Sequence, residues 1–416
     1  MKLKKYRLAD IGKVITGKTP STSIAENYAC GNIPFYTPED VAKGLGMMGR
    51  NNRFISQTGF EEIASNTISG ESVLVGCIGS DMGNVAYSNI TCATNQQINS
   101  ITQFKNGAEP LYVYYLLSTM KPYFQKIAGS TTTPILPKSV FEEIEIYLPG
   151  IKYQKDIVSI LYALDRKIAL NHQINDNLEA MAKQLYDYWF VQFDFPNEEG
   201  KPYKSSGGAM VWNDKLKRKI PQGWSGVSLK DLALTSRNAI TPVENEVYQH
   251  FSIPSFDACG SYSLDNGSDI KSDKFVLQKG QLLVSKLNPW FNRVVWVPKG
   301  TNMIGSTEFV VLNPNNESES GYIYSVIKSP KFIAYCSQAA TGTSHSQRRV
   351  SPDVLMAFKV VYEQGVVQKY GCLIEKIQKQ QAELLSEIAI LTKQRDELLP
   401  LLMNGQATVN YHLSDD

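Results

Sequence analysis

The 416-residue chain has few cysteines, and their spacing matches no metal or disulfide motif. The six cysteines form no C-x-x-C pair, and no histidine stands near them at the spacing of a zinc site. Cysteines of this kind are typical of reduced, mostly buried thiols. We therefore expect a cytoplasmic protein without a metal site.

Long apolar runs are also absent. No stretch approaches the roughly 18 consecutive apolar residues of a membrane-spanning helix. The basic start, Met1 to Lys5, is followed by Asp10 and Lys13 before any apolar segment forms, which is not the pattern of a signal peptide. The sequence therefore predicts a protein that does not associate with membranes.

Catalytic motifs are missing as well, and the four histidines are scattered. One tetrapeptide, Asn288-Pro289-Trp290-Phe291, resembles the Asn-Pro-Pro-Tyr/Phe motif of adenine-N6 methyltransferases. Such an enzyme needs a glycine-rich cofactor loop upstream in the same domain, and none is present. We therefore expect that the chain is not an enzyme and binds no cofactor. A self-contained adenine-N6 DNA methyltransferase remains the alternative.

An excess of positive charge is absent too. Lys and Arg number 42 against 40 Asp and Glu, which gives a formal net charge of +2. A protein that binds nucleic acid unaided usually has a clear basic excess. The positive charge that contacts DNA phosphates must therefore be concentrated locally or be supplied partly by partner proteins.

The strongest pattern present is an apolar seam within residues 151–190. Its members recur in steps of three and four, as in the a and d positions of a coiled-coil helix. The seam consists of Ile157, Leu161, Leu164, Ile168, Leu178, Ala182, Leu185 and Trp189. Only Asn171 and Asn175 interrupt it. A helix of this length is a rod of roughly 60 Å, which needs a partner to bury its seam.

The partner is predicted at the other end of the chain. The second seam consists of Tyr370, Ile374, Ile377, Leu384, Ile388, Leu391, Leu398 and Leu402. Every seam position of the first helix has a counterpart in the second at one constant offset. We expect the two helices to pair antiparallel, and Pro400 to bend or end the second one.

The segments before the two helices repeat each other. Matching pairs are 8–11 with 229–232, 70–74 with 280–284, an aromatic helix broken at Pro122 or Pro330, and the polar loops 129–133 and 341–346. The predicted organisation is a domain at 1–150, a helix at 151–192, a linker at 193–226, a domain at 227–365, a helix at 366–405 and a tail at 406–416. The predicted class is α+β, with two globular domains related by a pseudo-twofold axis and joined by two long antiparallel coiled-coil helices.

Polar, aromatic and basic loops stand at equivalent places in both repeats. Arg and Gln suit bidentate contacts to guanine and adenine, respectively. The candidate DNA-contacting residues of the first repeat are Lys18, Thr19, Thr37, Ser80, Asp81, Asn84, Ser130, Thr131, Thr132 and Lys138. Those of the second are Arg237, Ser255, Asn288, Trp290, Asn292, Arg293, Ser344, His345, Ser346, Gln347, Arg348 and Arg349.

On these features the whole chain resembles a specificity subunit of a type I restriction–modification system. The most specific stretches are 185–208, 220–224 and 398–405. The resemblance implies two target recognition domains that each read one half of a split, asymmetric DNA site, with paired spacer helices that set the gap.

The resemblance also implies partners. Two modification subunits would carry S-adenosylmethionine and the base-flipping adenine chemistry. A restriction/translocase subunit would add the ATP- and Mg²⁺-dependent motor and nuclease. A coiled-coil scaffold without a DNA role is the other alternative.

Overall fold

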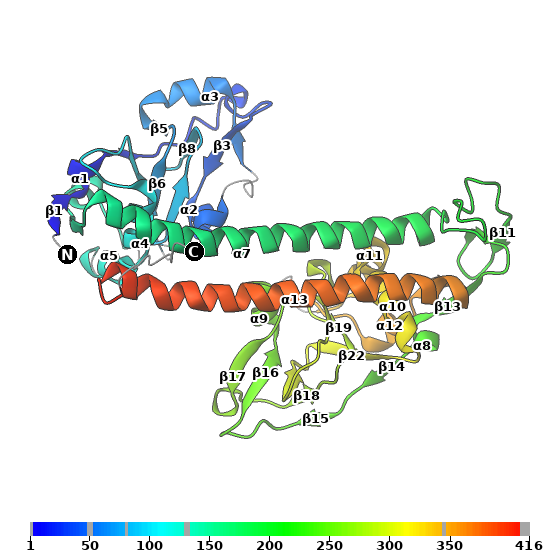
Figure 1. The fold of residues 1–416 in the computed structure, drawn as a ribbon. Helices are drawn as coiled ribbons and strands as arrows, with labels where there is room; N and C mark the ends of the chain where they lie inside the picture. Colours follow the sequence, from blue (N-terminus) through cyan, green and yellow to red (C-terminus); the bar gives the residue numbers. More distant parts are fainter. Residues whose placement is uncertain (1–2, 48–52, 80–81, 129–133, 343–346, 408–416) are drawn as a thin grey trace, which may run out of the picture. The chain divides into compact units, whose positions relative to one another are not determined.

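The computed structural model describes residues 3–47, 53–79, 82–128, 134–342 and 347–407 (Figure 1). The chain divides into two compact units. Unit 1 consists of Met1–Leu170 and Ile388–Asp416, and unit 2 consists of Asn171–Glu387. Both boundaries fall inside long helices, so each unit contains a globular domain and a segment of each long helix.

The globular part of unit 1 contains two sheets and a terminal strand pair. The first sheet is antiparallel in the order β2-β9-β6-β7, with strands Lys13–Thr16, Ile98–Thr102, Ser72–Gly76 and Val85–Ser88. The second has the order β4-β3-β8-β5, with strands Phe54–Ile55, Ile33–Tyr36, Cys92–Thr94 and Thr67–Ile68, and its β3 and β8 run parallel. Strands β1 (Lys4–Arg7) and β10 (Glu145–Leu148) pair, which joins the two ends of the domain's sequence.

The globular part of unit 2 repeats this topology. Its first sheet has the order β14-β22-β19-β20, with strands Ala233–Ser236, Phe309–Pro314, Leu282–Ser285 and Val294–Trp296. Its second has the order β15-β18-β21-β16-β17, with strands Ala239–Ile240, Lys274–Val276, Met303–Gly305, Val247–Phe251 and Ser263–Asn266. Strands β16 and β21 are the parallel pair, and β13 (Ser225–Ser228) pairs with β23 (Lys359–Tyr362). Apart from the additional strand β15, the strand order of unit 2 matches that of unit 1, which supports the predicted internal repeat.

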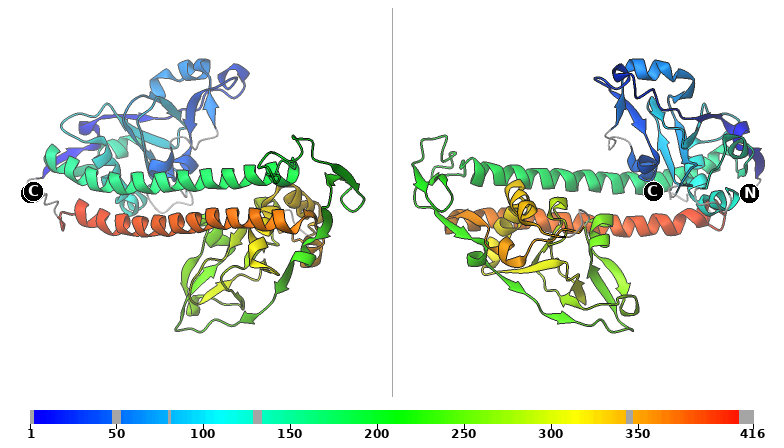
Figure 2. Two further views of the ribbon diagram at one scale, coloured as in Figure 1. Left: turned by 45° about the vertical axis from the view of Figure 1, so that its right-hand side comes forward. Right: turned by 180° about the vertical axis from the view of Figure 1, so that it is seen from behind.

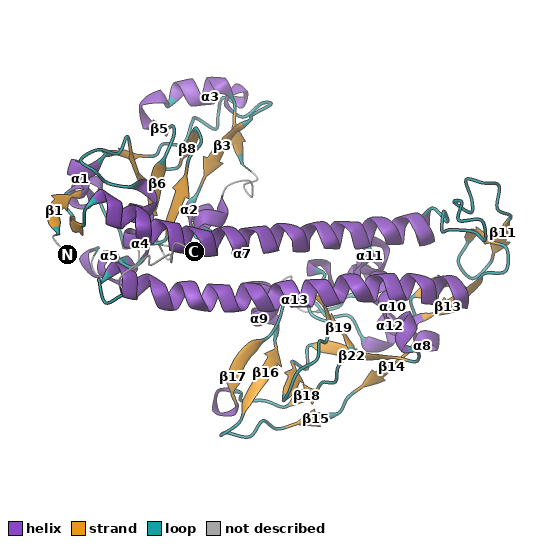
Figure 3. Ribbon diagram, in the orientation of Figure 1, coloured by secondary structure: helices purple, strands orange, loops and turns teal. Residues whose placement is uncertain are grey.

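Short helices accompany the sheets of both units (Figure 3). Those of unit 1 are α1 (Leu8–Ile11), α2 (Pro38–Val41), α3 (Gln57–Glu62), α4 (Pro110–Ser118), α5 (Lys121–Ile127) and α6 (Lys138–Glu142). Those of unit 2 are α8 (Leu229–Leu232), α9 (Ile253–Cys259), α10 (Ser320–Lys328), α11 (Pro330–Ala339) and α12 (Pro352–Met356). The predicted breaks fall where a new helix begins: Pro122 is the second residue of α5 and Pro330 is the first residue of α11, in the first turn, where the N–H needs no partner within the helix.

Single turns complete the secondary structure. The 3-10 turns are η1 (Ala25–Asn27), η2 (Gly44–Met47), η3 (Ala64–Asn66), η5 (Gly267–Asp269), η6 (Pro289–Phe291) and η7 (Glu317–Glu319). The π turn η4 (Asp187–Val191) extends the first long helix. Among the described residues, no helix is both long and apolar enough to cross a membrane.

The two long helices are α7 (Ile151–Tyr186) and α13 (Gln364–Met403). In unit 1, Arg395 of α13 bonds Asp165 of α7 with an Nη1–Oδ1 distance of 2.8 Å. In unit 2, Asn171 donates to Glu387 at 2.7 Å, and Tyr370 donates to the carbonyl of Ala182 at 3.4 Å. In unit 2 the partner residue on α13 changes from Glu387 to Tyr370 as the residue on α7 changes from Asn171 to Ala182, which confirms the antiparallel pairing.

The predicted seam is confirmed by burial. Its apolar members are all buried or half-buried, while neighbouring positions such as Lys167 and Lys376 are exposed. The predicted seam residues with this burial are Ile157, Leu161, Leu164, Ile168, Leu178, Leu185, Ile374, Ile377, Leu384, Ile388, Leu391 and Leu398. Helix α13 continues past Pro400 and ends at Met403, so the proline stands in the last turn, where few hydrogen bonds depend on it.

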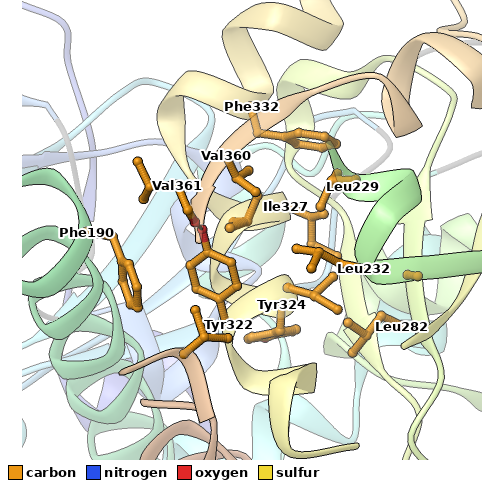
Figure 4. Close-up of a cluster of buried hydrophobic side chains, with 14 of the residues drawn as sticks. Phe190, Leu229, Leu232, Leu282, Tyr322, Tyr324, Ile327, Phe332, Val360 and Val361 are labelled. Atoms are coloured by element: carbon orange, nitrogen blue, oxygen red, sulfur yellow. Dashed lines mark hydrogen bonds between the residues drawn. The ribbon is translucent and has the colours of Figure 1, made fainter. Parts of the chain in front are cut away.

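The seams extend into the domain cores. In unit 1, Ile157, Leu161 and Leu402 belong to the same buried cluster as the α4 residues Tyr112 and Tyr115. In unit 2, Phe190 lies beside Tyr322 of α10, whose hydroxyl donates to the carbonyl of Val361 (Figure 4). In unit 2 the same cluster contains Ala182 of α7 and Ile374 of α13, so both long helices contribute to the core of each unit.

The segment predicted as a linker, 193–226, is folded into unit 2. Phe195 stacks between Tyr203 and Trp224, with ring centroids 4.8 and 4.9 Å away. Strands β11 (Met210–Asn213) and β12 (Arg218–Pro221) form a hairpin (Figure 2). The Pro, Gly, Ser and Lys content favoured a flexible linker, but the interspersed aromatic side chains bury enough apolar surface to order the segment.

Candidate DNA interface

The tip of the β19–β20 hairpin, residues 286–293, is the first component of the site in unit 2. Asn288 and Asn292 adopt φ values of +48° and +50° on either side of the η6 turn. Asparagine tolerates this left-handed conformation better than most residues. The resulting tip exposes Trp290 by 40% and Phe291 by 57%.

Residues 347–350 lie against this tip. Asn288 donates its backbone N–H to the carbonyl of Arg348 at 2.7 Å, and the N–H of Arg348 donates to Oδ1 of Asn288 at 3.0 Å. The N–H of Val350 donates to the carbonyl of Lys286 at 3.1 Å. Two loops far apart in the sequence therefore form one surface.

Unit 1 has the same arrangement. Its β6–β7 hairpin tip meets the segment that follows the loop 129–133. The N–H of Gly79 donates to the carbonyl of Pro134 at 3.1 Å, and the N–H of Leu136 donates to the carbonyl of Cys77 at 2.8 Å. In each unit, the structure thus brings the hairpin together with a segment beside the polar loop that the sequence singled out.

Two predicted contact residues are buried, which corrects their assignment. Arg293 is 8% exposed and binds Asp257 through both Nε and Nη2, at 2.6 and 2.7 Å. Ser255 is 8% exposed, and its hydroxyl accepts the N–H of Ser252 at the start of α9. Both side chains stabilise unit 2 through internal hydrogen bonds and are buried from solvent.

Other predicted residues have partners within the protein. Arg349 forms a bidentate pair with Glu308, with Nε–Oε2 and Nη2–Oε1 distances of 3.0 Å. These hydrogen bonds raise the pKa of Arg349 above its ordinary value. The hydroxyl of Thr37 accepts from Arg53 at 2.8 Å and caps α2 together with Asp40. Positive charge at these sites is locally neutralised.

The remaining side chains of unit 1 differ in availability. Lys18 is exposed, and Thr19 donates to Gln96 at 2.8 Å. Asn84 accepts from the ammonium of Lys121 at 2.7 Å. Lys138 forms a looser pair with Glu142 at 3.5 Å.

In unit 2, Arg237 and Gln347 are exposed, and Arg348 is half-buried. Eight predicted contact residues lie outside the described residues: Ser80, Asp81, Ser130, Thr131, Thr132, Ser344, His345 and Ser346. Within the described residues, no group of three or more His, Cys, Asp or Glu side chains could hold a metal ion.

Sequence reasoning missed the partners that shape these loops. Asp257 and Glu308 lie far from Arg293 and Arg349 in the sequence, and no local pattern links them. The sequence indicates Lys121, next to Pro122, only as part of the break in the aromatic helix. Phe291 belongs to the tetrapeptide 288–291, but it is not among the predicted DNA-contacting residues. The only sequence signal for its exposure is that polar and aromatic residues stand next to each other at the hairpin tip.

Comparisons with known proteins show which proteins this chain resembles. The model of the "Type I restriction modification DNA specificity domain" matches residues 2–180. The type I restriction enzyme MjaIX specificity subunit of Methanocaldococcus jannaschii is 27% identical over 423 residues, covering 97% of this chain and 93% of that relative. The chain is therefore similar to type I restriction–modification specificity subunits over nearly its whole length.

Two further similarities fit this specificity-subunit family. The HindI specificity subunit of Haemophilus influenzae is 34% identical over 166 residues, which cover 37% of this chain and 34% of that one. The crystal structure of a type I restriction–modification S subunit from M. genitalium superposes with a TM-score of 0.60 at 14% identity, covering 97% and 96% of the two chains. This second likeness concerns the fold.

The methyltransferase alternative finds no support in the specificity-subunit fold. Asn288 is tied to Arg348 by two hydrogen bonds, and Pro289 is buried. The tetrapeptide is therefore a structural part of the hairpin tip.

Proposed function

We propose that this specificity subunit reads a bipartite, asymmetric DNA site, with one half-site for each globular domain. The observation that supports the proposal is that in both units a hairpin end is hydrogen-bonded to the segment beside a polar loop, while the residues of the two sites differ. Since the loops differ, the half-sites differ as well. The gap between half-sites is set by the paired helices α7 and α13, to which both units contribute.

The subunit itself is non-catalytic in this proposal and binds no cofactor. Two modification subunits supply S-adenosylmethionine and adenine methylation, and restriction/translocase subunits supply ATP- and Mg²⁺-dependent cleavage. The complex acts in the cytoplasm. The nearly neutral net charge supports a need for partners, and Arg293 and Arg349 of the candidate site are ion-paired within the protein.

A gel-shift titration of the reconstituted complex with its modification subunits tests the proposal. Selected duplexes should bind at least a hundredfold more tightly than random duplexes at the same salt concentration. Arg348→Ala should weaken binding to the selected duplex more than Lys219→Ala, which removes the same charge from the exposed face of β12.

The scaffold alternative makes the opposite prediction. The double variant Arg348→Ala/Arg349→Ala would leave the affinity of the complex for DNA unchanged. Equal affinity of the complex for selected and random duplexes would exclude the proposed function.

A further inference from the structure

An exposed aromatic pair marks the hairpin tip of unit 2. The rings of Trp290 and Phe291 lie 6.0 Å apart between centroids, at an angle of 48°. They are 40% and 57% exposed at a surface that is otherwise built from polar side chains and backbone. Large aromatic side chains are enriched where proteins bind partners, because their apolar area contributes strongly to affinity.

Buried contacts fix the position of the pair. The guanidinium of Arg293 lies 4.5 Å from the centre of the Phe291 ring. That guanidinium is held in turn by its bidentate pair with Asp257. Pro289 is buried beneath the tip, and Asn288 is anchored to Arg348. The rings are therefore preorganised, which reduces the entropy lost on binding.

The same contacts decide how the rings can meet DNA. A ring that slips between two base pairs needs both faces free to stack. One face of Phe291 is covered by Arg293, and most of the Trp290 surface is already packed. The pair is thus suited to apolar contact at the edge of the bases. In the major groove, the apolar feature of a base edge is the C5-methyl group of thymine.

We propose that Trp290 and Phe291 contact thymine methyl groups in the half-site that unit 2 reads. This inference rests on the proposed function and adds the chemistry of one half-site. The corresponding tip of unit 1 contains no aromatic residue in residues 79–84. There, Met82 is 1% exposed and Asn84 bonds Lys121, so methyl dependence is confined to one half-site.

Replacement of thymine by deoxyuridine tests the inference, since it removes only the methyl group and keeps base pairing. The duplex is the selected site, and the substitution is made in one half-site at a time. In the half-site assigned to unit 2, each contacted methyl should contribute roughly fourfold to affinity, which corresponds to about 0.8 kcal/mol. Deoxyuridine in the other half-site should leave the affinity unchanged.

Protein variants combined with the deoxyuridine substitution form a double-mutant cycle. Phe291→Ala and Trp290→Ala should weaken binding to the thymine duplex and remove the difference between thymine and deoxyuridine duplexes. The matched control is Trp212→Ala, which removes a 59% exposed tryptophan from β11 and should keep that difference. Circular dichroism of each variant verifies that it is folded.

The outcomes separate the two proposals. Sequence-selective binding without any deoxyuridine effect, or a unit 2 half-site that contains no A·T pair, would overturn the inference and leave the proposed function standing. If binding unstacks 2-aminopurine in the duplex, and this unstacking requires Phe291 but not the thymine methyl groups, the ring inserts between bases. That result would also overturn the inference. Absence of sequence selectivity in the wild-type complex would refute the proposed function itself.

Discussion

Replacement of Arg395 by Met should destabilise unit 1 strongly. Asp165 is buried in the seam with 8% of its side chain exposed, and its two oxygens accept from Arg395 at 2.8 Å and from Tyr115 at 2.7 Å. Burial, followed by the charge of Asp165, raises the pKa of Tyr115 well above its ordinary value, so its hydroxyl remains a donor. Methionine keeps an unbranched apolar stem in the seam but leaves one carboxylate oxygen without its cation.

The expected loss follows from the exposure of the pair. Removal of one partner from a fully buried ion pair costs about 3–5 kcal/mol. The Arg395 side chain is 28% exposed, so water can reach part of the vacated space. We therefore expect the free energy of unfolding to fall by about 2–3 kcal/mol, a value reduced from the fully buried case for this solvent access.

Urea denaturation followed by far-ultraviolet circular dichroism measures this change. Arg166→Met is the matched control, because Arg166 is the exposed neighbour of Asp165 on α7 and its loss should cost less than about 0.5 kcal/mol. Replacement of Tyr115, Asp165 and Arg395 by Phe, Leu and Leu together should restore stability to within about 1 kcal/mol, since no polar group is then left unpaired. Equal stabilities for Arg395→Met and Arg166→Met would refute the argument.

Three further predictions concern the close packing of Gly371, the acid-sensitive helix cap formed by Asp40, and the length of the two long helices. Gly371→Ala should destabilise unit 2 despite a gain in helix propensity of about 1 kcal/mol, because the new Cβ would lie 1.9 Å from the carbonyl oxygen of Ser318. Gly365→Ala, with no atom closer than 3.4 Å, is the thermal-denaturation control and should be neutral or stabilising. Burial raises the pKa of Asp40, but hydrogen bonds from Thr37 and Lys43 outweigh it and leave that pKa below its ordinary value. The stabilisation is then present above about pH 4 and lost as the pH falls further, so the stability difference between wild type and Asp40→Asn should shrink in acid; a constant difference would contradict this. Deletion of one heptad from both long helices should shorten the gap tolerated between half-sites without changing the bases read, and an unchanged gap would show that the helices do not set it.

The elements that depend on periodic patterns could be predicted from the sequence. The seam of α7 and α13 follows a strict three-four spacing, and the burial of Ile157, Leu161 and Ile374 agrees with it. The repeat could be found because the same turn and helix signals occur twice, including the breaks at Pro122 and Pro330. Such signals are local, so a single sequence contains them.

Features that depend on long-range contacts could not be predicted. The pairing of Arg293 with Asp257 joins a hairpin tip to a helix, and the sequence presents that arginine as an ordinary exposed loop cation. The order of segment 193–226 depends on stacking of Phe195 with Trp224. In both cases composition suggested solvent exposure, whereas tertiary packing determined the outcome.

The central claim is that each globular domain reads its own half of the DNA site. Its most direct test is to co-express the chain with its modification subunits and to sequence the methylated adenines in the host DNA, for wild type and for Gln347→Ala/Arg348→Ala. We predict a split motif of which one half becomes relaxed in the variant, while the other half and the gap stay the same. A contiguous motif, or a variant in which both halves change together, would contradict the account.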